Sequence, residues 1–288
     1  MNVQRVIPSG YCKGVINAIN IAKKAKDKNP NTDVFVLGNL VHNSFVTKQL
    51  NDYGIITLDD TNKTRSELLD EINSGTLILT AHGTSDEVIA KAKAKGLEVI
   101  DGTCEDVLKT KNIIINYLDK GYDVIYYGKR NHPEANAIVS MSDKIHLICN
   151  EEDITNLTIK NKQIVFTNQT TMSFIELERI VDLLKEKYQT IEIIKEICNA
   201  TSLRQQAILN LDDCDVLYIV GDSKSNNTNR LVSIAKNNNI KKVYMINDYR
   251  DINKKDLIGQ NNIYVSAGAS TPPTLIDEAI NYLKNITF

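Results

Sequence analysis

Three cysteines at nearly equal intervals constrain this chain more than any other feature. Cys12, Cys104 and Cys198 are separated by 92 and 94 residues in a chain of 288, and a helix-like pattern follows each of them. Near-equal spacing of this kind is what a unit repeated three times would produce. The spacing therefore predicts a triplicated fold, and the rest of the sequence can be tested for the same period.

A strand-like run and a glycine recur after each cysteine in the sequence. After the helical pattern, an apolar run ends at Gly38, Gly128 or Gly221, which lie 26, 24 and 23 residues beyond their cysteines. A polar segment follows each glycine, and farther on a second apolar run ends in another polar turn. Further helical patterns then cover residues 85–95, 173–187 and 273–284. Alternating strand and helix patterns are typical of βαβ units with parallel sheets.

The third repeat lacks a closing strand of its own. Strand patterns over residues 97–100 and 191–194 lead to the second and third cysteines, and residues 3–7 lead in the same way to the first. We therefore predict an α/β fold of three similar lobes, with mainly parallel sheets in a pseudo-threefold arrangement around a central cavity. The predicted lobes are residues 13–103, residues 104–197, and residues 198–288 completed by residues 1–12.

Composition excludes several classes of protein. The apolar share of 42% and the charged share of 24% are those of an ordinary soluble protein. A net charge of −2 gives no support to a nucleic-acid or anionic-membrane partner. No apolar run reaches the ~18 residues of a membrane span, and no signal-peptide pattern is found at the N-terminus. We expect a cytoplasmic protein, in which five cysteines are thiols or metal ligands rather than disulfides.

The repeated cysteines predict a metal centre. Ligands gather at the carboxyl ends of parallel strands, so three lobes facing one axis would bring the three cysteines together. Three thiolates without a fourth at matching spacing leave one coordination position open, and the paired Cys-x-x-Cys of closed zinc sites is absent. A [4Fe–4S] cluster with one open iron fits this pattern, and a zinc ion with a bound water is the alternative. Cys149 and Cys214 fall outside the repeat and are interpreted as structural.

Polar turns beside the cysteines predict an anionic ligand. Their side chains share the ability to donate hydrogen bonds to anionic oxygen. The donors are His42, His82, His132, Thr170, Thr171, Ser225, Asn227 and Ser270. No Gly-rich nucleotide-binding motif accompanies them, which favours a small phosphate or diphosphate ester.

Glu134 is the candidate general acid. It lies two residues after His132 and is the one carboxylate in the polar turn of the second repeat. Burial beside an anionic ligand would raise its pKa and keep it protonated. The alternative is a solvated carboxylate or a partner in a helix cap.

Nine motifs taken together resemble the LytB/IspH family of 4-hydroxy-3-methylbut-2-enyl diphosphate reductases, in the correct order and over essentially the whole chain. They occupy residues 10–15, 41–43, 81–83, 103–104, 132–134, 169–171, 197–201, 225–231 and 267–270. The resemblance implies a three-lobed α/β protein with a central [4Fe–4S] cluster. It also implies the last step of the methylerythritol phosphate pathway, in which the substrate's C4 hydroxyl is removed reductively to give isopentenyl and dimethylallyl diphosphates. Ferredoxin or flavodoxin would supply the electrons.

The resemblance also implies roles for single residues. Cys12, Cys104 and Cys198 match the cluster ligands. Glu134 matches the proton donor, and Thr170 and His132 help to relay the proton or hold the hydroxyl. The residues that match the substrate-binding set are His42, His82, His132, Thr170, Ser225, Asn226, Asn227 and Ser270.

Three segments depart from the family pattern. Cys104 is followed by the acidic pair Glu105-Asp106, where the family usually has Pro and an apolar residue. Asn226 replaces a common serine, and residues 129–131 are larger and more basic than usual. The acidic pair would place negative charge near the cluster, so we expect it to lower the reduction potential. A zinc-dependent hydrolase of a phosphorylated substrate and a non-catalytic redox or anion sensor remain the alternatives to a reductase.

Overall fold

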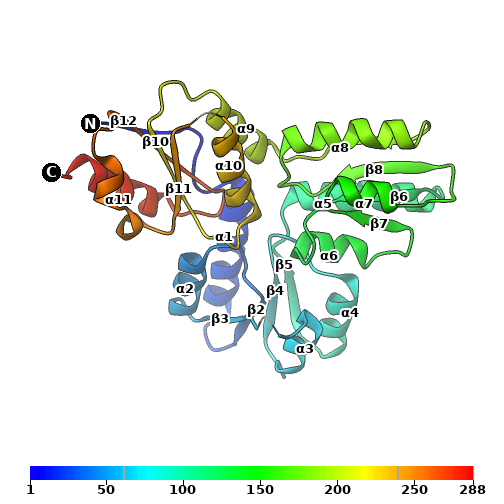
Figure 1. The fold of residues 1–288 in the computed structure, drawn as a ribbon. Coiled ribbons are helices and arrows are strands. Elements are labelled where there is room, and N and C mark those ends of the chain that lie inside the picture. Colours follow the sequence, from blue (N-terminus) through cyan, green and yellow to red (C-terminus); the bar gives the residue numbers. More distant parts are fainter. Residues whose placement is uncertain (61, 239, 288) are drawn as a thin grey trace. The chain divides into compact units, whose positions relative to one another are not determined.

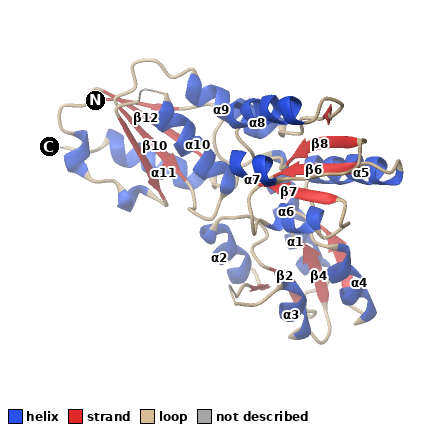
Figure 2. Ribbon diagram, turned by 45° about the vertical axis from the view of Figure 1, so that its right-hand side comes forward, coloured by secondary structure: helices blue, strands red, loops and turns tan. Residues whose placement is uncertain are grey.

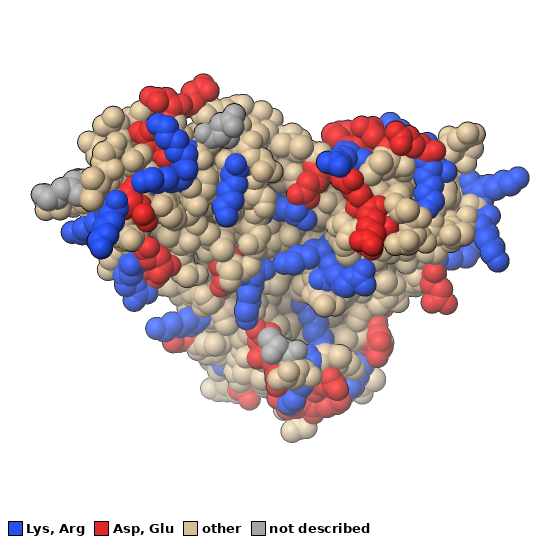
Figure 3. Space-filling view, in the orientation of Figure 1, with Lys and Arg blue, Asp and Glu red and all other residues tan. Residues whose placement is uncertain are grey.

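The protein forms parallel sheets with helices between successive strands, in a computed structural model that describes residues 1–60, 62–238 and 240–287 (Figures 1 and 2). In this part of the chain there are three sheets, each of four parallel strands. The predicted fold class is thereby confirmed. None of the described helices is both long and apolar enough to span a membrane. Figure 3 shows side chains of both charge signs on the drawn face, in keeping with a net charge near zero.

The chain divides into two compact units. Unit 1 comprises Met1–Ile16, His42–Val46 and Asn199–Phe288, and unit 2 comprises Asn17–Val41 and Thr47–Cys198. Helix α1 (Lys13–Lys28) and helix α2 (Ser44–Asp52) each continue from unit 1 into unit 2. The boundaries of the three lobes stay a prediction, because this division by compactness groups the first two sheets together.

Unit 2 contains two of the sheets. The first has the strand order β3-β2-β4-β5, and the second has the order β7-β6-β8-β9. The strands of the first sheet are β2 (Val34–Leu37), β3 (Ile55–Leu58), β4 (Thr76–Leu79) and β5 (Glu98–Asp101), with helices α3 (Arg65–Asp70) and α4 (Asp86–Ala94). The strands of the second are β6 (Asp123–Tyr127), β7 (Ile145–Ile148), β8 (Ile164–Asn168) and β9 (Glu192–Ile193), with helices α5 (Glu105–Asp119), α6 (Pro133–Val139), α7 (Glu151–Asn156) and α8 (Phe174–Lys187).

Unit 1 contains the third sheet, with the order β1-β12-β10-β11. Its strands are β1 (Asn2–Arg5), β10 (Val216–Val220), β11 (Lys242–Ile246) and β12 (Asn262–Ala267). Its helices are α9 (Asn199–Leu209), α10 (Asn226–Asn237) and α11 (Pro273–Lys284), with 3-10 turns η1 (Tyr249–Asp251) and η2 (Lys254–Leu257).

The third sheet separates two apolar layers. Tyr218 and Val220 of β10 pack with Leu275 of α11 on one face, whereas Leu217 and Ile219 pack on the other with residues of α9 and α10. Alternate residues of a strand point to opposite faces, so every residue of β10 is buried. Burial on both faces explains why this strand reads as one continuous apolar run rather than an alternating one.

The N-terminal strand completes the third sheet. Strand β1 pairs in parallel with β12, with Val3 opposite Ile263, and the N–H of Val6 continues the ladder by donating to the carbonyl of Val265 at 2.9 Å. Strand β1 therefore holds the edge position beside β12 that β5 holds beside β4 and β9 beside β8. This is the pairing that the sequence predicted for the strand before Cys12.

The repeated glycines have a shared structural role. Each follows the first strand after its cysteine and donates its N–H to the last carbonyl of the neighbouring edge strand. The three hydrogen bonds are Gly38 to Leu58 at 2.7 Å, Gly128 to Ile148 at 3.0 Å and Gly221 to Ile246 at 2.8 Å. The polar segments beyond them are helix starts rather than loops. In the third sheet, Ser225 caps α10 by accepting a hydrogen bond from the N–H of Thr228.

The close packing of Thr228 in α10 against Gly268, just after β12, can be tested by substitution. A methyl group on Gly268 would lie 2.1 Å from Oγ1 of Thr228, whose side chain is completely buried. We expect Gly268→Ala to lower the free energy of unfolding by roughly 1–3 kcal/mol, as overpacking does. Because Thr228→Ala removes the clashing atom, the double variant should lose less stability than the two single losses combined. Urea unfolding of the four proteins measures this coupling, and strictly additive losses would contradict it.

Candidate functional site

The three cysteines occupy the same place in their repeats. Each directly precedes a helix (α1, α5 or α9), and each donates its N–H to the carbonyl two residues beyond the end of the neighbouring strand. The three hydrogen bonds are Cys12 to Ala269 at 3.1 Å, Cys104 to Ala81 at 3.0 Å and Cys198 to Thr170 at 3.0 Å. None of these three cysteines forms a disulfide, and each is partly exposed.

The two other cysteines have different surroundings. Cys214 is buried, and burial is the main cause that raises its pKa to about 12, so it stays a neutral thiol. The N–H of Cys149 is bound by the carboxylate of Asp153 at 2.7 Å, in a turn that leads into α7. Neither takes part in the repeated contact, in keeping with the structural role expected for both.

Glu134 lies in the first turn of α6, and its side chain is 1% exposed. Its Oε1 accepts hydrogen bonds from the N–H of Thr170 at 2.8 Å and from the hydroxyl of Tyr126 at 3.4 Å, while its Oε2 accepts from Oγ1 of Thr170 at 3.0 Å. Burial raises the pKa of Glu134 to about 7, although the bonds from Thr170 and Tyr126 act in the opposite direction. The alternative of a solvated carboxylate is therefore wrong.

Thr170 joins the acid to one of the cysteines. Its N–H and hydroxyl bind the carboxylate of Glu134, and its carbonyl accepts the N–H of Cys198. The same turn places Thr171 within reach of Gln169, whose side-chain NH₂ donates to Oγ1 of Thr171 at 3.0 Å. Thr170, just beyond the end of β8, thus contacts both the carboxyl group of Glu134 and the backbone of Cys198.

His132 caps α6 and lies edge-on to His82. Its Nδ1 accepts the N–H of Glu134 at 3.2 Å, so the neutral ring carries its proton on Nε2 and can donate from there. The two rings are 5.3 Å apart between centroids, with an interplanar angle of 74°. The carbonyl of Ala81, the residue before His82, accepts the N–H of Cys104.

Unit 2 therefore holds a polar site whose residues come from the turns after β4 and β8, the ends before α5 and α9, and the start of α6. It brings together six of the predicted residues: His82, Cys104, His132, Glu134, Thr170 and Cys198. Such a site offers two thiols, two imidazoles and a neutral carboxyl group that can donate a proton at neutral pH.

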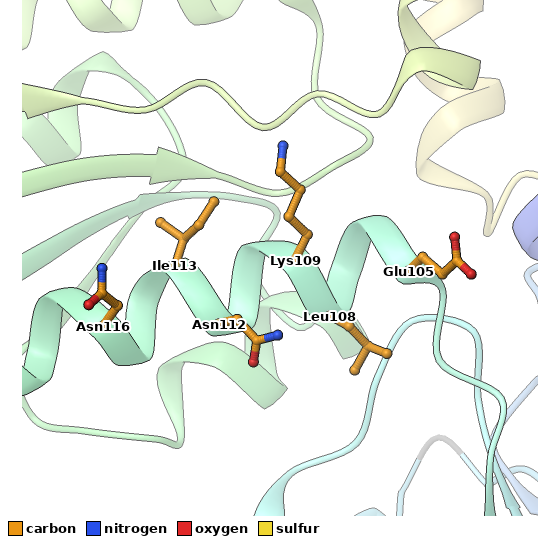
Figure 4. Close-up of a pocket in the computed structure, with 6 residues that line it drawn as sticks. All are labelled: Glu105, Leu108, Lys109, Asn112, Ile113 and Asn116. Carbon is orange, nitrogen blue, oxygen red and sulfur yellow. The ribbon is translucent and has the colours of Figure 1, made fainter.

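The two residues of the acidic pair after Cys104 have different surroundings. Both residues lie in the first turn of α5, but Oδ2 of Asp106 is 3.9 Å from Sγ of Cys104. Asp106 also faces Glu134 closely enough to contribute to its raised pKa. The negative charge expected beside this cysteine therefore comes from Asp106. Glu105 instead lines a shallow surface groove whose residues all belong to α5, shown in Figure 4.

Unit 1 holds a second polar network around Cys12. The carbonyl of Ala269 accepts the N–H of Cys12, and the N–H of Ala269 donates to Oδ1 of Asn227 at 3.1 Å. Asn227 in turn donates from Nδ2 to Oγ1 of Thr201 at 3.0 Å, and Ser270 donates to the carbonyl of His42 at 2.9 Å.

The start of α10 supplies the other predicted residues of this network. Ser225 is its N-cap, and Asn226 and Asn227 form its first turn, all three of them buried. The first N–H groups of a helix attract anions, so this helix start has the chemistry expected of a phosphate-binding segment. Unit 1 thus brings together Cys12, His42, Ser225, Asn226, Asn227 and Ser270.

Three contributors were missed by the sequence analysis. Tyr126 binds Glu134 but reads as an ordinary apolar strand residue. Arg65 donates to the carbonyl of Gly83 at 2.7 Å and so holds the turn that carries His82, and Arg204 holds the segment before Cys12. These contacts span 8, 18 and 194 residues, and no local pattern marks any of the three side chains as a contributor.

The chain is similar to a family of known proteins over nearly its whole length. A family model described as "LytB protein" matches residues 3–284. A 4-hydroxy-3-methylbut-2-enyl diphosphate reductase of Bacillus subtilis is 44% identical over 287 residues, which cover 99% of this chain and 91% of that protein. The enzyme of the same name from Macrococcus caseolyticus is 43% identical over 289 residues, covering 99% and 89%.

Two solved structures are similar over the whole chain. The E-1-hydroxy-2-methyl-but-2-enyl-4-diphosphate reductase of Plasmodium falciparum has a TM-score of 0.90 at 31% identity, covering 99% of this chain and 89% of that one. A structure of (E)-4-hydroxy-3-methyl-but-2-enyl diphosphate reductase, described as the terminal enzyme of the non-mevalonate pathway, has a TM-score of 0.69 at 28% identity, covering 99% and 100%.

The raised pKa of Glu134 predicts an unusual pH dependence of stability. An acid with a raised pKa binds its proton more tightly in the folded state, so the contribution of Glu134 to stability is greatest below its ordinary pKa of 4.5 and is lost as the pH rises through about 7. Relative to Glu134→Gln, the wild type should lose on the order of 3 kcal/mol over this range. Urea unfolding at pH 5, 6, 7 and 8 tests it, and parallel stability curves for the two proteins would contradict it.

Proposed function

Because the chain belongs to the LytB protein family, we propose that it reduces 4-hydroxy-3-methylbut-2-enyl diphosphate to isopentenyl and dimethylallyl diphosphates. The reaction consumes two electrons and two protons: the C4–O bond breaks, the hydroxyl leaves as water, and a C–H bond forms. Relatives that bear this enzyme's name match 99% of the chain, and the structural observation that carries the proposal is the buried Glu134, joined through Thr170 to Cys198.

The cysteines fit an iron–sulfur cofactor, which membership of the family implies. Cys12, Cys104 and Cys198 form no disulfide, are partly exposed and share the same backbone hydrogen bond, and thiolate is the normal ligand of such clusters. We assign them as the three ligands of a [4Fe–4S] cluster with one open iron. When bound, the cluster supplies the electrons and a Lewis-acidic iron for the hydroxyl oxygen.

The protein's own residues bind the substrate and handle the proton. Glu134 holds a proton at neutral pH because burial raises its pKa, and Thr170 fixes its carboxyl group in one orientation. His132 presents Nε2–H as a donor, and His82 lies beside it. In this proposal the diphosphate is bound by His42, His82, His132, Thr170, Ser225, Asn226, Asn227 and Ser270.

Ferredoxin or flavodoxin is the proposed electron donor, and a cytoplasmic location stays a prediction. A zinc-dependent hydrolase and a sensor are less well supported. Relatives that bear a reductase's name favour a reductase over a hydrolase, and a non-catalytic sensor would not need a buried acid joined to a candidate ligand cysteine.

Anaerobic purification tests the cofactor. We expect a brown protein with iron and acid-labile sulfide, whose cluster spectrum shifts when the diphosphate substrate is added. Cys104→Ser should lose most of the iron, whereas the matched control Cys149→Ser should keep it, because Cys149 lies outside the repeated contact. A colourless wild-type protein that contains zinc but neither iron nor sulfide would overturn the proposed function.

The role of Glu134 is tested by turnover. Glu134→Gln keeps the shape of the side chain but cannot supply a proton, so turnover with a reduced low-potential donor should fall by ~10²–10⁴. The cluster spectrum and its shift with substrate should be retained, since no cysteine contact changes. Near-normal turnover in this variant would remove Glu134 from the mechanism.

A further inference from the structure

Tyr126 of β6 is a buried tyrosine whose hydroxyl reaches the candidate general acid. Its side chain is completely buried in an apolar layer with Ile114 of α5 and Ile138 of α6. A tyrosine hydroxyl in such a layer needs a polar partner, and here that partner is Oε1 of Glu134 at 3.4 Å. An apolar core and the proton donor are therefore connected through one side chain.

The sheet holds the ring of Tyr126 in place. Tyr126 lies on the inner strand β6, opposite Leu147 of β7 and Thr167 of β8. A Cβ on Gly128 would lie 3.0 Å from Cε1 of the ring, so the ring fills the space beside this glycine. Core side chains packed this closely keep one orientation. The fold therefore determines where the hydroxyl oxygen lies.

The two carboxyl oxygens of Glu134 face different donors. Oε1 accepts the N–H of Thr170 at 2.8 Å and the hydroxyl of Tyr126, whereas Oε2 accepts the hydroxyl of Thr170 at 3.0 Å. A backbone N–H can only donate, but a hydroxyl can also accept. When the acid is neutral, Oε2 can therefore donate its proton to Oγ1 of Thr170, while the two donors on Oε1 occupy both of its lone pairs.

We propose that Tyr126 is a positioning residue for the acid: together with the N–H of Thr170 it keeps Oε1 as the carbonyl oxygen, so that the proton of Glu134 lies on Oε2. The effect on catalysis rests on the proposed function, but the location of the proton does not. A proton held at one oriented atom is transferred more readily than one shared between two oxygens. The tyrosine hydroxyl also stabilises the carboxylate, which makes Glu134 a stronger acid than burial alone would leave it.

The other titratable groups around Glu134 are unchanged by a substitution at Tyr126. Asp106 of α5 faces Glu134 and contributes to its raised pKa, and Nδ1 of His132 accepts the N–H of Glu134. Burial keeps the pKa of the Tyr126 hydroxyl well above its ordinary value, so this residue stays a neutral donor near pH 7. A change in the titration of Glu134 then reports the loss of the hydroxyl.

Two tyrosines on the same strand provide a variant and its matched control. Tyr126→Phe removes the hydroxyl and keeps the ring. The control is Tyr127→Phe, because the hydroxyl of Tyr127 donates to Oε2 of Glu176 at 3.0 Å in the apolar layer on the other face of the sheet. Each variant loses one hydrogen bond from a buried tyrosine to a carboxylate. A third variant, with 3-fluorotyrosine at position 126, keeps the hydroxyl and makes it a stronger donor.

Infrared difference spectra of the anaerobically purified protein, recorded as a function of pH, test the location of the proton. The carbonyl band of protonated Glu134 is identified by its loss in Glu134→Gln. We expect Tyr126→Phe to move this band to higher frequency, because the carbonyl oxygen loses a donor. The midpoint of its titration should rise by roughly 0.5–1 pH unit. The 3-fluorotyrosine variant should lower the midpoint, and Tyr127→Phe should change neither value.

Turnover tests the effect on catalysis. With a reduced low-potential donor, Tyr126→Phe should lower kcat several-fold at an unchanged KM, because the tyrosine contacts the acid and not the substrate. The alkaline limb of its pH profile should move to higher pH together with the infrared midpoint. Tyr127→Phe should keep the wild-type profile. A Tyr126→Phe enzyme whose kcat matches the wild type at every pH contradicts the positioning role.

The remaining outcomes separate this inference from the proposed function. An unchanged band and midpoint in Tyr126→Phe, or changes that Tyr127→Phe reproduces, overturn the inference alone. If Tyr126→Phe does not fold, the 3-fluorotyrosine variant decides, and a midpoint at or above the wild-type value overturns the inference. A wild type without iron and sulfide overturns the proposed function, while the infrared spectra still decide which oxygen carries the proton.

Discussion

The hydrogen bond from each cysteine N–H to a carbonyl beyond the neighbouring strand is the interaction on which the site depends. The edge strand leads in sequence to the cysteine, and the adjacent strand must end where its following carbonyl can accept the cysteine N–H. The register between the two strands therefore determines where the cysteine lies. The edge strands β1, β5 and β9 meet this requirement alike, although β1 comes from the opposite end of the chain. The contact is therefore a property of the repeated fold rather than of the local sequence.

The same fold also raises the pKa of the buried carboxyl group of Glu134. The fold buries the carboxyl group and provides three hydrogen bonds to it, which favour the charged form, but the loss of hydration outweighs them. The result is an acid that titrates close to neutral pH rather than one fixed as a carboxylate. Its partner Thr170 also holds Cys198, so the position of the acid and that of the thiol are coupled through one turn.

Much of this architecture could be predicted because its signals are local. The inner strands β2 and β10 are mostly buried apolar runs that end directly before Gly38 and Gly221, where the sequence predicted strands. The outer strands β3 and β11 were not predicted, because edge strands are only partly buried and carry mixed patterns such as Lys242–Ile246. The cysteines, histidines and Glu134 stood out by residue type. Tyr126 did not, because a buried tyrosine in a strand looks like core until its hydroxyl is seen to reach the acid.

Equal backbone geometry does not mean equal electrostatics at the three cysteines. Each precedes a helix, so the positive end of a helix dipole is common to all three. The side chains around them differ: Asp106 lies near Cys104, whereas Arg204 lies beside the segment before Cys12. If the cysteines ligate one cluster, its potential reflects the sum of these unequal surroundings. The repeated fold can then keep the ligand geometry constant while substitutions in single repeats adjust the potential.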